Sequence, residues 1–419
     1  MKTSFLLVFT SLVILGISSV PAQNPREVFQ TMIPPLPEHI LPEEPKGRIL
    51  GPGLFNHSLP IREAYHSGSN TYAGHSAKGE LYIRKEREDD LTIISEPKAG
   101  WRWDIADALW SPTGKYLLVK QIRDTGVPRI ELTKTDTILH WPYTRAGESL
   151  PEIQYYIVTP ETGRITAVDH NRQMPYVHPL SWNDTTEEVR IVQADRLMKN
   201  LELLRVDSRT GKSQIWFKDH SEEFLIGLDL LQGYTGRLRE ANFFYFLNDM
   251  DQFIYKSERS GYYQLYLYNK NGELLRPLTS YENNGLVDHL KQVDTGTGWV
   301  YFTSHDDPQH PYSEQLYRSS LTENYVQKIA HGPYFMDIFF SENKDSIWVW
   351  RHNLEKFSRL EIYSPDGEKL NTTWEVDMSI LDRLGFAPEF EQLTASDGET
   401  LIEAMILKPK NFDQEKNIL

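Results

Sequence analysis

The residues best suited to bind a metal lie in the run His305-Asp306-Asp307-Pro308-Gln309-His310, with His289 and His331 not far away in the sequence. Imidazole and carboxylate groups are common ligands of divalent metals. These histidines lack the short spacing that places two ligands on one helix face, as in His-Glu-x-x-His. The run has the composition of a polar loop between strands, so the sequence predicts no metal site and no cofactor.

Covalent catalysis is not predicted either. The chain has no cysteine, which excludes a thiol nucleophile, a thiolate zinc site and disulfides. It also has no Gly-x-Ser-x-Gly segment, the turn that exposes a nucleophilic serine beside an oxyanion hole. We therefore assign no catalytic residue.

Two adjacent carboxylates can pair one ammonium group. The candidates are Glu88-Asp89-Asp90, Glu187-Glu188 and Glu222-Glu223. Each lies in a polar segment, so a solvated loop charge is the expected role and no substrate-binding residue is assigned. Glu258 and Arg259 follow a predicted strand; such a pair could contact substrate, but we expect it to brace neighbouring sheets.

Tryptophans could also line a ligand groove. Aromatic side chains in strands pack by default into the core or between neighbouring sheets, and we expect this role for the five candidates, Trp101, Trp103, Trp110, Trp348 and Trp350.

The net charge argues against two classes of partner. The 419-residue chain carries a formal charge of −15, spread along its length. This disfavours nucleic acid and anionic membranes as partners, and acidic solubility explains the charge. With 39% hydrophobic residues, a chain of this length can bury a large core without disulfides.

The N-terminus has the order of a secretory signal peptide: Lys2, an apolar run, then small residues up to Ala22. The apolar run is interrupted before the roughly 20 residues that a membrane span needs. We therefore expect cleavage after residue 22, no membrane span afterwards, and export to the periplasm or the cell exterior. The proline-rich residues 23–50 predict an arm that leads into the fold.

From Gly51 to Pro388 the sequence predicts an all-β domain. Short runs rich in aromatic and β-branched residues have the length and composition of strands. They include Tyr116–Val119, Tyr155–Val158, Glu202–Val206, Phe253–Tyr255, Gln264–Tyr268, Trp299–Phe302 and Ile347–Trp350. Glycine-containing phrases separate such runs and predict hairpins between the outer strands of a sheet. These phrases are Thr159–Arg164, Asp207–Lys212, Asn269–Glu273 and Ser364–Glu368.

The spacing of similar phrases selects the fold. Openings such as Leu109–Lys115, Leu180–Asp184 and Phe339–Asp345 recur within a period of roughly 40 to 55 residues, the length of a four-stranded propeller blade. Tandem immunoglobulin-like domains would repeat at roughly 100 residues. The sequence thus predicts a β-propeller of seven or eight blades over residues 51–388.

The pattern changes again in residues 389–419. Glu391–Ser396, the turn at Asp397-Gly398 and Thr400–Pro409 predict one hairpin. Two strands alone are marginally stable, so we interpret residues 389–419 as the start of a further domain.

Several of these phrases, taken in order, resemble the dipeptidyl peptidase IV branch of the prolyl oligopeptidase superfamily of serine peptidases. They are Trp110–Pro112 with Gly114–Tyr116, Pro142–Pro151, Ser257–Tyr262 with Leu265–Tyr268, Val300–Thr303 with Leu316–Arg318, and Asp397–Phe412. The resemblance implies an eight-bladed propeller that caps an α/β-hydrolase domain holding the Ser-Asp-His triad. It also implies a peptide substrate and a possible homodimer.

The chain departs from this family in two ways. No triad residue can be assigned, and residues 389–419 would be the beginning of a truncated peptidase domain, so chain 1–419 is expected to be inactive alone. The family's Tyr-Glu-Glu amine-binding setting is not found ahead of Trp110, which leaves cleavage specificity open. Two functions remain: the propeller portion of a secreted serine peptidase that gates and binds peptide, or a stand-alone propeller that recognises protein or glycan.

Overall fold

The computed structural model describes residues 63–76, 78–86, 90–134, 137–225, 243–352, 358–375, 386–409 and 413. The predicted signal peptide and arm lie outside these ranges. Strands dominate the described residues, and their helical segments are α2 (Tyr281–Asn284) and the 3-10 turn η3 (Asn248–Met250). The prediction of an all-β chain is confirmed. No helix in the described ranges has the length and apolarity needed to cross a bilayer.

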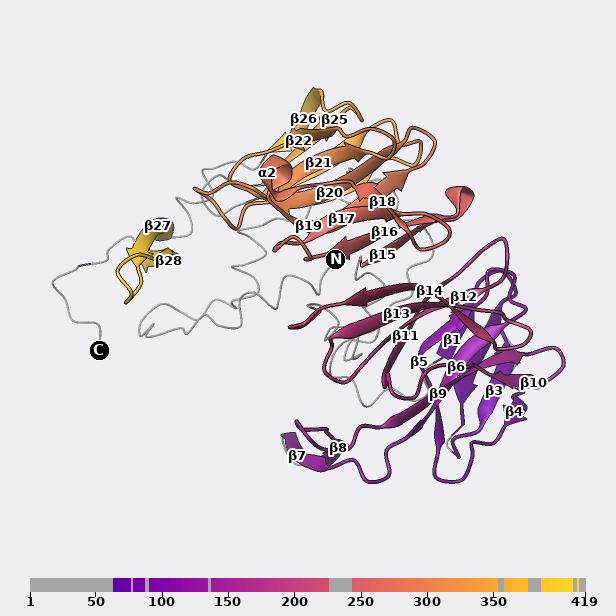
Figure 1. The fold of residues 1–419 in the computed structure, drawn as a ribbon. Coiled ribbons are helices and arrows are strands. Elements are labelled where there is room, and N and C mark those ends of the chain that lie inside the picture. The colour runs from indigo at the N-terminus through magenta and orange to yellow at the C-terminus, as the bar shows by residue number, and fades with distance from the viewer. Residues whose placement is uncertain are drawn as a thin grey trace. The chain divides into compact units, whose positions relative to one another are not determined.

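Most strands belong to six four-stranded sheets, which we number in chain order (Figure 1). The first sheet holds β1 (Glu63–His66), β2 (Thr71–His75), β3 (Leu81–Lys85) and β4 (Thr92–Ser95). The second holds β5 (Arg102–Trp110), β6 (Leu117–Arg123), β9 (Glu152–Thr159) and β10 (Arg164–Ala167). The third holds β11 (Tyr176–Trp182), β12 (Val189–Ala194), β13 (Asn200–Val206) and β14 (Ser213–His220).

The later sheets repeat the arrangement. The fourth holds β15 (Phe244–Leu247), β16 (Gln252–Ser257), β17 (Gln264–Tyr268) and β18 (Leu274–Pro277). The fifth holds β19 (Leu286–Asp294), β20 (Trp299–His305), β21 (Gln315–Ser320) and β22 (Val326–Ala330). The sixth holds β23 (Phe335–Phe340), β24 (Ile347–His352), β25 (Arg359–Tyr363) and β26 (Lys369–Glu375). The described residues contain six such sheets, so the predicted count of seven or eight blades is not confirmed.

Two hairpins form two-stranded sheets of their own. β7 (Arg129–Lys134) and β8 (Thr137–Pro142) form a two-stranded insertion between β6 and β9. β27 (Phe386–Thr394) and β28 (Leu401–Pro409) pair over their whole length, which confirms the hairpin predicted around Asp397-Gly398.

The described residues divide into two compact units, residues 63–302 with 319–326 and residues 303–318 with 327–413. The first four sheets belong to the former unit, where the core lies between successive sheets. In β6, Leu117 and Val119 belong to the cluster shared with the first sheet, whereas Leu118 belongs to the cluster shared with the third. Because alternate side chains point to opposite faces and both faces are covered, the consecutive residues Leu117, Leu118 and Val119 are all apolar.

Three of the four predicted turn phrases have a second role, because each of the three also contacts the preceding sheet. In the turn after β13, the Asp169 N–H donates to the Gly211 carbonyl at 2.8 Å. In the turn after β17, the Lys270 carbonyl accepts from Trp216 Nε1 at 2.9 Å. In the other unit, Gln327 Nε2 donates to the Asp366 carbonyl at 3.0 Å. The repeated turns therefore join one sheet to the next.

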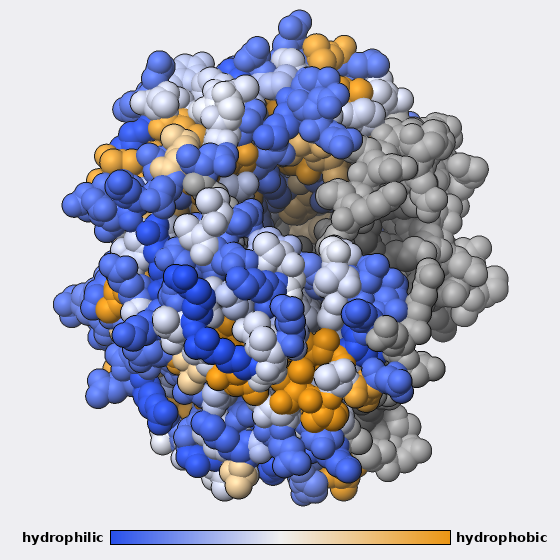
Figure 2. Space-filling view, turned by 90° about the vertical axis from the view of Figure 1, so that its right-hand side faces the viewer, coloured by the Kyte–Doolittle hydropathy of each residue, from blue (hydrophilic) through white to orange (hydrophobic). Residues whose placement is uncertain are grey.

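The surface agrees with the acidic, polar composition. On the face drawn in Figure 2, hydrophilic residues predominate and hydrophobic residues form separate small patches. The fully buried apolar side chains include Leu117, Leu118 and Val119 of β6 and Tyr155, Ile157 and Val158 of β9.

Candidate functional site

The two ends of the sheets in the first unit differ. Because consecutive strands are antiparallel, the turns after the first and third strands of a sheet lie at one end. The loops after the second strand and the connections between sheets lie at the other. The first end has tight turns such as Thr159–Arg164, whereas the second carries the β7–β8 insertion. Loops of the second kind are the usual carriers of binding residues. We call the two ends the turn end and the loop end.

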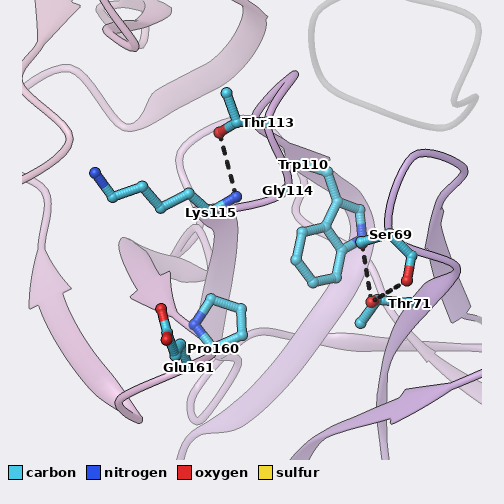
Figure 3. Close-up of a pocket in the computed structure, with 8 residues that line it drawn as sticks. All are labelled: Ser69, Thr71, Trp110, Thr113, Gly114, Lys115, Pro160 and Glu161. Atoms are coloured by element: carbon cyan, nitrogen blue, oxygen red, sulfur yellow. Dashed lines mark hydrogen bonds between the residues drawn. The ribbon is translucent and has the colours of Figure 1, made fainter.

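The turn end contains a pocket of about 320 Å³, shown in Figure 3. We call it the Trp110 pocket. It is lined by Ser69, Thr71, Trp110, Thr113, Gly114, Lys115, Pro160 and Glu161. These residues come from the β1–β2 turn, the start of β2, the end of β5, the β5–β6 turn and the β9–β10 turn. The first and second sheets thus build the pocket together.

Trp110 is held in one orientation at this pocket. Its Nε1 donates to the Ala64 carbonyl at 3.0 Å, and the His66 ring lies 5.7 Å from the indole. Figure 3 shows the indole between Ser69 and Thr71 on one side and Lys115, Pro160 and Glu161 on the other. Trp110 is partly buried against the core cluster shared by the first and second sheets, which is the role expected of it, and it also lines the pocket. Trp103 and Trp350 are buried.

The β5–β6 turn keeps its glycine for a tertiary reason. Gly114 has φ +74°, and a Cβ there would lie 2.7 Å from the His66 ring. His66 also contacts the same turn through its Nε2, 3.1 Å from the Pro112 carbonyl. The turn phrase is therefore shaped by the first sheet as well as by its own backbone.

Glu187, expected to be a solvated loop charge, instead contacts two residues that line the pocket. It accepts from Thr113 Oγ1 at 2.6 Å and lies 3.7 Å from Lys115 Nζ. Glu222 does carry a solvated charge, since its side chain is 90% exposed and contacts His220 at 3.2 Å. Glu88 and Asp89 lie outside the described residues.

At the loop end, Arg259 reaches from the fourth sheet to the third. Its Nη2 lies 3.4 Å from Asp219 Oδ2, and its guanidinium lies 4.7 Å from the centre of the Tyr266 ring. The nearby Tyr255 has a raised pKa. Burial is the main cause, and Asp219 raises that pKa further. A guanidinium placed between two sheets over an aromatic ring can brace them, and it can also present a charge to a ligand.

Two exposed aromatic residues lie at the loop end of the fourth sheet. Tyr262, in the β16–β17 loop, and Tyr281, in α2, stack with ring centres 4.0 Å apart and planes 14° apart. Their exposed fractions are 47% and 45%. Exposed, rigid tyrosines are typical of surfaces that bind peptides and proteins, because they contribute large contact area at low entropic cost.

A buried charged group lies in an irregular part of β5, where residues 105–108 stand opposite the single residue Val119 of β6. Asp107 Oδ2 accepts from Lys120 Nζ at 2.8 Å and from the Tyr155 hydroxyl at 2.6 Å. Burial alone would raise the pKa of Asp107, but Lys120 and Tyr155 outweigh it and hold that pKa low. The pair stays ionised near neutral pH, so it does not suit proton transfer.

The histidine run predicted as a polar loop is one. Residues 306–314 connect β20 to β21, and His305 Nδ1 lies 2.9 Å from the Ser313 carbonyl. Asp306 accepts from Tyr317 and from Lys328 Nζ. These contacts tie the loop to β21 and β22 within their unit.

The comparisons with known proteins agree with this architecture. The sequence pattern of the family described as the dipeptidyl peptidase IV (DPP IV) N-terminal region matches residues 106–358. The crystal structure of dipeptidyl peptidase 4 from Porphyromonas gingivalis is similar, with a TM-score of 0.67 at 17% identity, over 86% of this chain and 52% of that one. That of a putative dipeptidyl aminopeptidase IV from Bacteroides ovatus gives 0.65 at 16% identity, over 84% and 52%.

These two structural likenesses show a common fold. The chain spans about half the length of either solved protein. The match to the family pattern covers more than half of this chain, from β5 to the end of the β24–β25 connection. The chain therefore belongs to the dipeptidyl peptidase IV N-terminal region family.

Proposed function

We propose that this polypeptide is the propeller portion of an exported serine peptidase of the dipeptidyl or oligopeptidase type, and that it binds the peptide substrate and limits its access to a hydrolase domain. The observation that carries the proposal is the family match over residues 106–358. Both similar solved proteins are described as dipeptidyl peptidases, and this chain aligns with about half of each.

The loop end of the first unit is the surface that suits a peptide best. It carries the stacked, exposed Tyr262 and Tyr281. Aromatic faces can pack against proline or other apolar side chains, and tyrosine hydroxyls can bond to peptide backbone. We therefore place peptide contact at this tyrosine pair.

The test is peptide binding by chain 1–419. A peptide with alanine and proline as its first two residues, a free N-terminus and a fluorophore at its C-terminal end is titrated with the protein, and fluorescence anisotropy is followed. We expect saturable binding that weakens about tenfold or more in Tyr262→Ala, because exposed tyrosines at binding surfaces are frequent hot spots.

Tyr325→Ala is the matched control. Tyr325 has the same exposed fraction as Tyr262, 47%, but lies in the β21–β22 turn at the other end of its sheet. This variant should bind the peptide as the wild type does. Absence of saturable binding to the wild type would overturn the proposal and favour the stand-alone protein-binding or glycan-binding propeller.

A further inference from the structure

The hydroxyl groups of the Trp110 pocket offer a ligand oxygen lone pairs and no protons. Ser69 Oγ lies 2.7 Å from His66 Nδ1 and 2.9 Å from Thr71 Oγ1, and its proton goes to one of these two acceptors. Thr71 Oγ1 donates to the Ser69 carbonyl at 3.1 Å. Thr113 Oγ1 donates to Glu187 at 2.6 Å. Because each hydroxyl has a single proton, all three protons are used within the protein. A ligand that bonds to these side chains must supply the donors.

The charges that line the pocket are of opposite sign. Lys115 Nζ lies 3.7 Å from Glu187, and Glu161 is an exposed carboxylate on the opposite wall. Glu187 offsets the charge of Lys115, so the two carboxylates of Glu161 and Glu187 outnumber the cation and disfavour an anion. Glu161 adds further lone pairs that can accept from a neutral donor.

The remaining walls are flat and apolar. The Trp110 indole is fixed by its bond to Ala64, and Figure 3 shows the Pro160 ring across the pocket from it. The cavity of about 320 Å³ lies near the lower limit of pockets that hold small ligands, about 300–1,000 Å³. A ligand that fits combines an apolar face of C–H groups with several O–H donors.

A pyranose ring has this combination, because its axial C–H groups form an apolar face while its hydroxyls surround the rim. We propose that the Trp110 pocket binds a neutral hexose unit, with the sugar face against Trp110 and its hydroxyls donating to Ser69, Thr71 and Glu161. The pocket lies at the turn end, and the loop end serves the peptide. The inference is thus independent of the proposed function.

The NMR signals of the tryptophan indole N–H groups test this proposal directly. The chain has ten tryptophans, and the Trp110 Nε1–H peak is assigned in tryptophan-labelled chain 1–419 by its absence from Trp110→Phe. The probes are the methyl pyranosides of glucose, galactose, mannose and N-acetylglucosamine. We expect at least one to shift the Trp110 peak selectively, with a dissociation constant of about 1 mM, as ligand efficiencies imply for a ligand of this size.

Thr71→Val and Thr92→Val form the matched pair. Both threonines belong to the first sheet, but only Thr71 lines the pocket, and Thr92 is exposed at the start of β4. Thr71→Val should weaken the hexoside about fivefold, because it removes one acceptor, and Thr92→Val should have no effect. The other indole peaks report that each variant is folded.

Two results would overturn the inference. The first is a Trp110 peak that no hexoside moves at tens of millimolar. The second is a peak that moves with the zwitterionic dipeptide Ala-Pro and not with any hexoside, which would assign the pocket to small peptides. Equal hexoside affinity in Thr71→Val and the wild type would reject the hydroxyl contacts proposed for Thr71.

Discussion

Gly211 faces the carbonyl oxygen of Ala167 so closely that a Cβ on Gly211 would lie 2.1 Å from that oxygen. The two residues belong to different sheets, Gly211 to the β13–β14 turn and Ala167 to β10. The same relationship recurs one sheet later, where a Cβ on Gly272 would lie 2.0 Å from the Trp216 carbonyl oxygen. Both turns therefore require glycine for two reasons: the backbone φ is positive, and the neighbouring sheet leaves no space for a Cβ.

Gly211→Ala should therefore destabilise the protein more than Gly163→Ala. The two positions have φ of +70° and +67°, but no heavy atom lies within 4 Å of a Cβ at Gly163. The left-handed backbone alone costs alanine about 1–2 kcal/mol at either site. At Gly211 the clash adds about 1–3 kcal/mol. Denaturant unfolding measures both, and equal losses would contradict the inter-sheet contact.

Glu361 should be essential to the stability of the unit that contains the sixth sheet. Its side chain is 1% exposed and lies 2.6 Å from both Arg351 Nε and Lys369 Nζ. Glu361→Gln leaves the buried Arg351 without its counter-charge, which costs about 3–5 kcal/mol. Glu152→Gln is the control, because the Arg123–Glu152 pair is about half exposed and is worth about 1 kcal/mol or less. A similar small loss in both variants would show that Glu361 is dispensable.

The contribution of Glu361 should also depend on pH. Burial alone would raise its pKa, but Lys369, Arg351, Tyr363 and Arg359 outweigh burial and lower it. A carboxyl with a lowered folded-state pKa stabilises the fold above its unfolded pKa of about 4.3 and loses that effect as the pH falls through the folded value. The difference in unfolding free energy between wild type and Glu361→Gln should narrow on acidification below about pH 4. A constant difference would contradict this assignment.

The effects of replacing Lys120 and Asp107 on the free energy of unfolding should be coupled. Lys120→Met leaves Asp107 buried without its cation, which costs about 3–5 kcal/mol. Adding Asp107→Asn removes the unpaired charge while keeping an acceptor for the Tyr155 hydroxyl, so the double variant should be more stable than Lys120→Met. The double-mutant cycle measures this coupling, expected at about 1–3 kcal/mol. Additive losses would show that the two charges act separately.

Arg259 remains predicted as a brace, and Arg259→Met separates that role from substrate contact. Loss of the Asp219 ion pair and of the contact with the Tyr266 ring should lower the unfolding free energy by about 1–2 kcal/mol. Affinity for the labelled peptide should not change, and Glu258→Gln serves as the neighbouring control. Weaker peptide binding with unchanged stability would make Arg259 a binding residue instead.

The strands and the turns could be predicted from the amino-acid sequence, because they depend on neighbours in the chain. The run Tyr155–Val158 lies within β9, and the glycine of the following phrase has the positive φ that was predicted. Period, composition and turn chemistry are enough for such elements. The sequence also shows, without a structure, that the chain has no thiol and no Gly-x-Ser-x-Gly segment.

Packing between sheets sets which of these similar elements have special roles. Gly163 and Gly211 each follow a threonine in similar turns, yet only Gly211 lies against another sheet. Trp103 and Trp110 lie in one strand, yet the first is buried and the second lines a pocket. Thr113 bonds to Glu187, 74 positions away. Such contacts arise when whole sheets pack face to face, and no local pattern of residues records which neighbour a side chain will meet.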